Sequence, residues 1–218
     1  MLPNPASRQG GRGIYVLAFD GACVFAPTDQ LEYITRAVAG HDPQSLLEAK
    51  TWQEILGPTA QAYGPIHHYY LDRRDALAEV AAGRRLNPTD VDALARLRAA
   101  VPTTEWVATG FTGQASLLFG IDEGDGLVAA ANLTPGPGLS AHADASTDVG
   151  FVVHPAARGR GFGTRIAALA ARQAIAMHGL ARFRTLSTSP STMAIAERLG
   201  FCEYGRNLAA YLTDGPAD

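Results

Sequence analysis

Two arginines alternate with three glycines in one short stretch, Phe151–Ala174, which reads FVVHPAARGRGFGTRIAALAARQA. An apolar run that ends in His-Pro comes before them, and apolar residues at helical spacing follow. The glycines and positive charges therefore stand at a strand-to-helix junction. The first N–H groups of a helix lack intrahelical partners and lie at the positive end of its dipole, so they favour anions. Because glycine also lets the backbone approach a ligand closely, the stretch predicts a phosphate-binding loop.

The charge distribution supports an anionic ligand at this place. The whole chain of 218 residues has a formal net charge of -3, which argues against a general nucleic-acid partner. From Phe151 to Arg206, however, the sequence carries far more arginines than acids (Arg158, Arg160, Arg165, Arg172, Arg182, Arg184, Arg198 and Arg206 against Glu197 and Glu203). This local excess indicates a polyanionic ligand, although some of these arginines are ordinary surface residues.

Two common phosphate-binding motifs fit poorly. A P-loop needs Gly-Lys followed by Ser or Thr, and the sequence has no such triplet. A dinucleotide site needs G-x-G-x-x-G and an acid about 20 residues further on. In GRGFGT, Thr164 stands where the third glycine belongs, and the next strand, RFRTLSTS, has no acid. A dinucleotide-binding oxidoreductase is therefore the disfavoured alternative.

The stretch resembles the signature of the GNAT superfamily of acyl-CoA-dependent N-acetyltransferases. That signature is Q/R-x-x-G-x-G/A after a strand ending in Val-x-Pro, and Arg158, Gly161 and Gly163 fill its three places after VHP. A second family feature, a helix that ends in Leu-Gly-Phe, is matched at Leu199–Phe201. The resemblance extends from about Ile66 to Leu212 by the order of elements.

The resemblance implies a fold of the α/β (α+β) class, with a mixed, mostly antiparallel GNAT-type sheet flanked by helices. We expect a loose tail over residues 1–13 and an N-terminal helical extension over residues 14–64 that packs on the core. The N-acetyltransferase domain is expected at residues 65–218. Within the extension, residues 28–64 are predicted to lie over the acceptor side of the sheet.

Periodicity predicts the individual elements. A strand pair is expected within residues 11–27, and helices near 28–40, 43–57, 87–101, 161–178 and 190–201. Strands are expected at 65–73, 146–155 and 182–189, with a hairpin over 115–136. Trp52, Trp106 and Met177 are predicted to lie in the core, and Val91 to belong to the apolar stripe of its helix. His67 and His68 are predicted to be ordinary strand residues.

The resemblance implies acetyl-CoA as the acyl-donor cosubstrate, without a metal. Backbone N–H groups of the loop and helix start would hold the pyrophosphate, the strand before the loop would pair with the pantetheine amides, and Ser189 would stand where the family often has Asn. The cofactor-binding residues implied in this way are Phe151, Val152, Val153, Arg158, Gly159, Arg160, Gly161, Phe162, Gly163, Thr164 and Ser189.

Direct attack on the thioester requires an acceptor amine that has lost its proton, so a general base is expected. Asp148, two residues before Gly150, is one candidate, and an edge-strand surface acid is its plain alternative. Glu105 is a second candidate, with a helix first-turn acid as its alternative. The family often has a proton-donating Tyr where this chain has Ala196, which leaves Tyr204 as the nearest phenol in sequence.

These observations predict a cytoplasmic N-acetyltransferase that acts on a primary amine, most simply of a small molecule. A catalytically silent acyl-CoA-binding or sensing module is the alternative, which Ala196 keeps open. No nucleic-acid or membrane partner is expected, and the oligomeric state stays open, a homodimer included. Cys23 and Cys202 are the only cysteines, too few for a disulfide framework or a zinc site.

Overall fold

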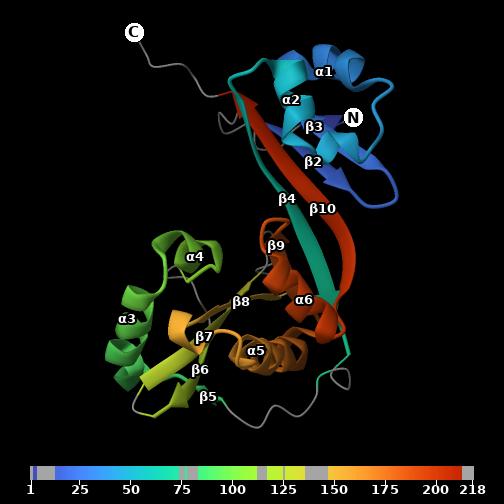
Figure 1. Cartoon of the computed structure of the whole chain (residues 1–218). Coiled ribbons are helices and arrows are strands. Elements are labelled where there is room, and N and C mark those ends of the chain that lie inside the picture. Colours follow the sequence, from blue (N-terminus) through green and yellow to red (C-terminus); the bar gives the residue numbers. More distant parts are fainter. Residues whose placement is uncertain are drawn as a thin grey trace. The chain divides into compact units, whose positions relative to one another are not determined.

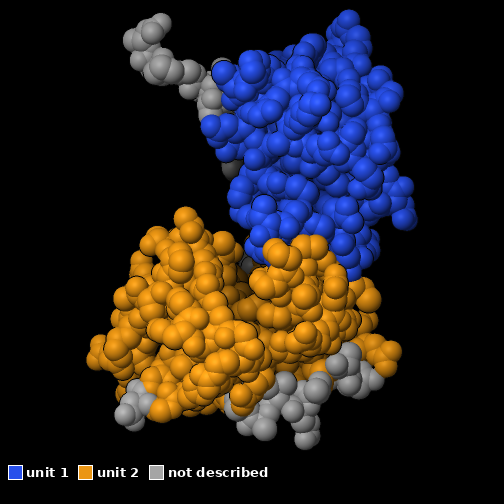
Figure 2. Space-filling view, viewed as in Figure 1, with its two compact units in different colours: residues 1–68, 185–189, 203–218 blue, residues 69–184, 190–202 orange. Residues whose placement is uncertain are grey.

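The computed structural model describes residues 2–3, 13–73, 77, 83–111, 117–124, 126–135 and 147–212. The chain divides into two compact units, coloured separately in Figure 2. Unit 1 comprises residues 1–68, 185–189 and 203–218, and unit 2 comprises residues 69–184 and 190–202. Most of the predicted tail over residues 1–13 lies outside the described residues. Leu2–Pro3 forms a short strand, β1, that pairs parallel with β3 (Ala22–Ala26).

Unit 2 contains the strand that precedes the glycine–arginine loop, together with the strands that pair with it. Its strand order is β4-β9-β8-β7-β6-β5, with only the last residues of β4 in this unit. The strands are β4 (Ala60–Leu71), β5 (Arg84–Arg85), β6 (Leu117–Glu123), β7 (Gly126–Pro135), β8 (Thr147–Val153) and β9 (Ala181–Leu186). Strands β5 to β8 pair antiparallel, whereas β8 and β9 pair parallel through the crossover helix α5 (Phe162–His178).

Side chains alternate between the two faces of a sheet along each strand. Both faces of this sheet carry apolar side chains, and helices cover both. Leu133 and Val153 lie in one apolar cluster with the alanine-rich side of α5, whereas Ala130 and Val152 lie in a second cluster with the other face's helices. Those helices are α3 (Val91–Ala100) and α4 (Thr103–Ala108), and Figure 1 shows them apart from α5 across strands β6–β8. Helix α6 (Pro190–Arg198) contributes the buried Ala196 to the α5 cluster.

Unit 1 has its own core, built on strands β2 (Ile14–Ala18), β3 and β10 (Cys202–Leu212). Its strand order is β1-β3-β2-β10-β4. Helices α1 (Leu31–Val38) and α2 (Ala49–Leu56) pack on these strands through Ile34 and the fully buried Trp52. The N-terminal segment is thus a hairpin with two helices. Whether residues 28–64 cover the acceptor side stays a prediction.

The predicted fold class is confirmed: the sheet is mixed, mostly antiparallel and flanked by helices. The hairpins, the crossover helix and the buried positions of Trp52 and Trp106 are also as predicted. Two side chains were assigned to the core wrongly. Val91 and Met177 follow helical spacing but lie at helix ends, where they stay exposed.

Gly150 is the tightest point between the sheet and the α4 side. An ideal Cβ on Gly150 would stand 1.9 Å from the Thr109 carbonyl oxygen and 2.3 Å from Oδ1 of Asn132. We expect Gly150→Ala to lower the free energy of unfolding by at least about 2 kcal/mol through overpacking. Urea unfolding measures this, with Gly126→Ala as the matched control because nothing lies within 4 Å of that position. Equal stability of the two variants would contradict the packing described here.

Candidate functional site

The loop between β8 and α5 is built on two left-handed glycines. A 3-10 turn, Pro155–Ala157, opens the loop, and Nδ1 of His154 accepts the Ala156 N–H at 3.2 Å. Gly159 and Gly161 then have φ angles of 74° and 81°, in the region that L side chains rarely adopt. Nothing lies within 4 Å of a Cβ built on either glycine, so both face open space.

Helix α5 starts at this loop and presents its first N–H groups there. Gly161 is the N-cap, and the Arg165 N–H donates to the Gly161 carbonyl at 3.1 Å. The N–H groups of the preceding residues 162–164 therefore have no acceptor within the helix. Gly163 has a different function, since a Cβ there would stand 3.0 Å from Cδ1 of Ile195 and 3.4 Å from the Phe151 ring. It lets α5 pack closely on β8 and α6.

Both arginines of the loop are held by acids in this structure. The Arg158 guanidinium donates to both carboxylate oxygens of Glu105 at 2.9 and 3.0 Å, and Arg160 donates to Glu123 at 2.6 Å. The Arg160 guanidinium also lies 5.2 Å from the centre of the Phe162 ring. Exposed ion pairs of this kind contribute roughly 0–1 kcal/mol, so a more strongly charged anion can displace the carboxylates.

The edge of β8 next to the loop is only partly paired. Its register with β9 comprises two residue pairs, Thr147–Ala181 and Asp148–Arg182, although β8 continues to Val153. The Thr147 N–H donates toward the β9 side, to Leu180, while the His154 N–H donates toward β7. Because these directions alternate along a strand, the N–H groups at positions 149, 151 and 153 face the side where pairing with β9 has ended.

Three predicted binding residues of β8 are separated by this alternation. Phe151 and Val153 direct backbone groups to the open edge, and the Val153 carbonyl there accepts Nε of Arg158 at 3.3 Å. Val152 instead pairs with Ala130 of β7, and its side chain is buried under α3 and α4. Its backbone therefore belongs to the sheet on the other side.

Asp148, one of the two predicted bases, lies between two guanidinium groups. Nε of Arg182 donates to its Oδ1, and Arg184 approaches its Oδ2 at 2.9 Å. Burial lowers the pKa of Arg182. Hydrogen bonds and charges from Asp148 and Tyr70 together raise it by more than burial lowers it, so the net pKa lies above its ordinary value. The Asp148 side chain is only 14% exposed. It thus fastens β8 to β9 at the place where they pair.

The other predicted residues lie in different surroundings. Glu105, on α4, is 39% exposed and contacts the loop through Arg158. Tyr204 belongs to unit 1, where its ring is 70% exposed and stacks on Phe19. Ser189, also in unit 1, donates its N–H to the Leu186 carbonyl at 2.9 Å. A capping role for Ser189 and a proton-donor role for Tyr204 stay predictions.

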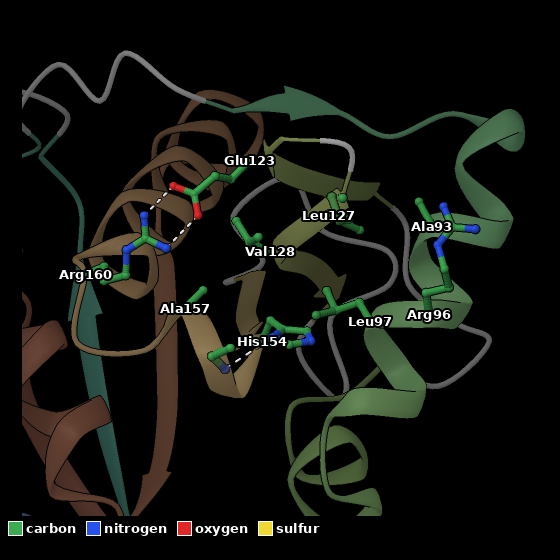
Figure 3. A pocket seen from close by; sticks show the side chains of 11 residues that line it. Ala93, Arg96, Leu97, Glu123, Leu127, Val128, His154, Ala157 and Arg160 are labelled. Atoms are coloured by element: carbon green, nitrogen blue, oxygen red, sulfur yellow. Dashed lines mark hydrogen bonds and ion pairs between the residues drawn. The ribbon is translucent and has the colours of Figure 1, made fainter.

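A cavity of about 360 Å³ lies on the α3 side of the loop. Figure 3 shows Ala93, Arg96 and Leu97 of α3 on one wall and His154, Ala157 and Arg160 on another, with the turn of the β6–β7 hairpin closing it. This volume is at the lower end of about 300–1,000 Å³ for small-molecule sites. The ion pair of Arg160 with Glu123 stands at its edge.

Asn132 is a polar residue that the sequence analysis missed. It lies in the middle of β7 at 0% exposure, and neither amide atom has a hydrogen-bond partner among the described residues. Gly150 and Gly110 lie against this amide, so Asn132 faces the α4 side. The signal in the sequence was a single asparagine in the apolar run GLVAAANL.

The described residues offer neither a metal-binding cluster nor a membrane-spanning helix. The described part of the chain has no group of three or more His, Cys, Asp or Glu that could hold a metal ion. Within the same residues, no helix is both long and apolar enough to cross a membrane.

The mixed sheet, its crossover helix and the glycine–arginine loop at the helix start define a protein of the acetyltransferase fold. The model of the acetyltransferase (GNAT) family matches residues 84–201, more than half of the chain. The chain therefore belongs to the GNAT acetyltransferase family. Comparison with curated proteins found no significant match.

Solved structures support the same fold. A GNAT-family acetyltransferase from Colwellia psychrerythraea has a TM-score of 0.57 at 12% identity, with 88% of this chain and 76% of that chain covered. A putative acetyltransferase of the same family from Novosphingobium aromaticivorans has a TM-score of 0.52 at 18% identity, over 72% and 69%. A GCN5-related N-acetyltransferase from Kribbella flavida has a TM-score of 0.51 at 18% identity, over 74% and 63%. At such identities the likeness shows the fold alone.

The Asn132 amide, which has no hydrogen-bond partner in the described part of the chain, leads to a stability prediction. A buried amide without partners costs about 1–3 kcal/mol, and leucine has a similar shape without polar atoms. We expect Asn132→Leu to stabilise the protein by about 1 kcal/mol, or to raise Tm by about 2–4 °C. Thermal unfolding measures this. Asn207→Leu is the matched control, expected to lower Tm because Oδ1 of Asn207 contacts Nε2 of His68. A lower Tm for Asn132→Leu would mean that the amide is paired after all.

Proposed function

We propose that the protein is an N-acetyltransferase that transfers acetyl from acetyl-CoA to a primary amine of a small molecule. Family membership supports acyl transfer from a CoA-linked donor. The observation that carries the proposal is a helix start with unpaired N–H groups and two arginines, directly after a strand that pairs with β9 over only two residues. An elongated ligand with phosphates at one end and amides along its length fits both features.

The donor would use groups of the loop, of the start of α5 and of the edge of β8. The N–H groups of residues 162–164 and the guanidinium groups of Arg158 and Arg160 would hold the pyrophosphate. Backbone groups of Phe151 and Val153 would pair with the pantetheine amides in place of the missing strand partner. Gly159 and Gly161 would allow this approach because no side chain stands between the backbone and the ligand.

In the proposed reaction the neutral amine attacks the thioester carbonyl, the C–S bond breaks and CoA leaves as a thiolate. The amine must first give up a proton to a base. Glu105 is the better placed of the two predicted acids, because phosphate would compete for its partner Arg158 and release the carboxylate. Asp148 would have to give up both arginines inside a nearly buried site. A base role for Asp148 therefore stays the less favoured proposal.

The thiolate needs little assistance, since a free thiol has a pKa of about 8.5. Ala196 has no proton to donate and is fully buried on α6. We therefore propose that water, or Tyr204 if its phenol reaches the sulfur, returns the proton.

A catalytically silent acyl-CoA-binding or sensing protein is the second candidate function. Ala196 favours it, as does the engagement of both predicted acids by arginines. Such a protein would bind acetyl-CoA with the same loop but would not turn it over with any amine. A panel of primary amines assayed for release of free CoA separates the two candidates.

The anion-binding role of the loop is tested at Gly161. We expect Gly161→Asp to weaken acetyl-CoA binding at least a hundredfold, because it places a negative charge beside the helix start. Calorimetric titration measures the Kd. Gly161→Asn is the matched control, since asparagine has the same shape, tolerates a positive φ and carries no charge. It should retain binding within about tenfold. Equal affinity of the two variants would show that charge at this position is irrelevant.

The base is tested by comparing two neutralised acids. If Glu105 is the base, Glu105→Gln should lower kcat by about 10²–10⁴-fold and remove the rising limb of the pH–rate profile. It should also bind acetyl-CoA at least as tightly, since Arg158 is then free for phosphate. Asp148→Asn should chiefly lower Tm, because Arg182 loses a buried partner. A stable Asp148→Asn variant with the larger loss of kcat would transfer the base role to Asp148.

A further inference from the structure

We infer that Ser187, His67 and Glu203 of unit 1 form a second acyl-transfer centre, in which Ser187 is a nucleophile for small activated esters and thioesters. The three residues come from three separate segments of the chain, all within unit 1. Nε2 of His67 lies 2.9 Å from Oγ of Ser187, and Nδ1 of the same ring lies 3.3 Å from Oε1 of Glu203. A nucleophile, a base and an acid that orients the base are recognised by this geometry and not by their order in sequence.

The fold fixes the three side chains from different directions. His67 lies on β4 and is 6% exposed, so its ring has a defined position. Ser187 directly follows β9, and its N–H donates to the Pro65 carbonyl at 3.2 Å, two residues before His67. Ser187 is exposed, so a substrate can reach its hydroxyl. Glu203 lies near the start of β10.

The charge of Glu203 favours one tautomer of His67. Burial raises the pKa of Glu203, but the hydrogen bond and the charge of Arg206 lower it, and the net pKa lies below its ordinary value. The carboxylate is therefore ionised at neutral pH and favours a proton on Nδ1 of His67. Nε2 then carries the lone pair that faces Ser187. Nδ1 of His67 and Oε1 of Glu203 are close enough for an ion pair but do not meet hydrogen-bond geometry in this structure. Catalytic hydrogen bonds are often poorly aligned until substrate binds.

The neighbouring histidine shows that this arrangement is not general for the strand. Nε2 of His68 contacts Oδ1 of Asn207, a neutral amide on β10. In the corresponding place around His67, Nε2 meets the hydroxyl of Ser187 instead. Ser187 could also donate to the Pro65 carbonyl, which lies 3.3 Å from its Oγ and offers the hydroxyl a structural alternative.

The proposed step conserves atoms and charge. Oγ of Ser187 forms a bond to the acyl carbon while its proton moves to Nε2 of His67, and the bond to the alcohol or thiol then breaks as His67 returns that proton to the leaving group. Water attacks the acyl-serine in the same manner and releases a carboxylic acid. This activity goes beyond the proposed function, because it uses none of the residues of the loop.

The experiment uses p-nitrophenyl acetate as the probe. The full-length protein should release p-nitrophenol, and peptide mass spectrometry of the quenched reaction should find an acetyl group on Ser187. Ser187→Ala should reduce the rate to that of buffer, and His67→Gln should reduce it about a hundredfold. Ser191→Ala and His68→Gln are the matched controls and should keep the wild-type rate. Gly161→Asp should keep it too, which separates this centre from the acetyl-CoA loop.

A fluorophosphonate probe provides a second measurement that does not depend on any variant folding. The wild-type protein should become labelled at Ser187, and acetyl-CoA should not protect it. The inference is overturned if neither reagent modifies Ser187, or if Ser187→Ala releases p-nitrophenol as fast as the wild type. In that event the cluster serves only to join the end of β9 to β4.

Discussion

The early end of pairing between β8 and β9 is the constraint on which the site depends. The strands share two residue pairs, at a place where Arg182 and Arg184 enclose the carboxylate of Asp148. Burying such charges is expensive unless each finds a partner, and here the partners belong to the two strands that must be joined. Beyond this point, among the described residues, the backbone of β8 pairs with a neighbouring strand on one side only. An open strand edge inside a protein needs another source of hydrogen bonds, and the proposed extended ligand would supply them.

The same constraint explains why the loop carries its charges. Helix α5 begins only a few residues after β8 ends, so its unpaired N–H groups lie near the open edge. Glu105 and Glu123 neutralise the two loop arginines at the surface. Such pairs are weak enough to exchange, and they keep the guanidinium groups beside the start of α5. If the loop binds the pyrophosphate as proposed, its charges are already in place.

The sequence predicted features that depend on local pattern. The order of elements around α5 and the hairpins follow from short-range periodicity, and the cluster of glycines marked the loop at the start of α5. It did not predict that Asp148 meets Arg182, because strand register depends on partners far away in sequence. The contact between His67 and Ser187 was not predicted for the same reason, since the two residues are 120 positions apart in the sequence. Helical spacing predicted that Met177 is buried, but this residue lies in the last turn of α5 and is exposed.

The two ion-paired acids also show how exposure could couple donor binding to catalysis. Glu105 and Asp148 both carry guanidinium partners, but Glu105 is 39% exposed and Asp148 only 14%. Water replaces a lost partner readily at the first site and poorly at the second, so only the first pair can open at small cost. If the donor's phosphates take Arg158, Glu105 becomes available as a base only after the donor has bound. An acceptor that arrived first would stay protonated, and the proposed reaction would then follow an order with acetyl-CoA before the amine.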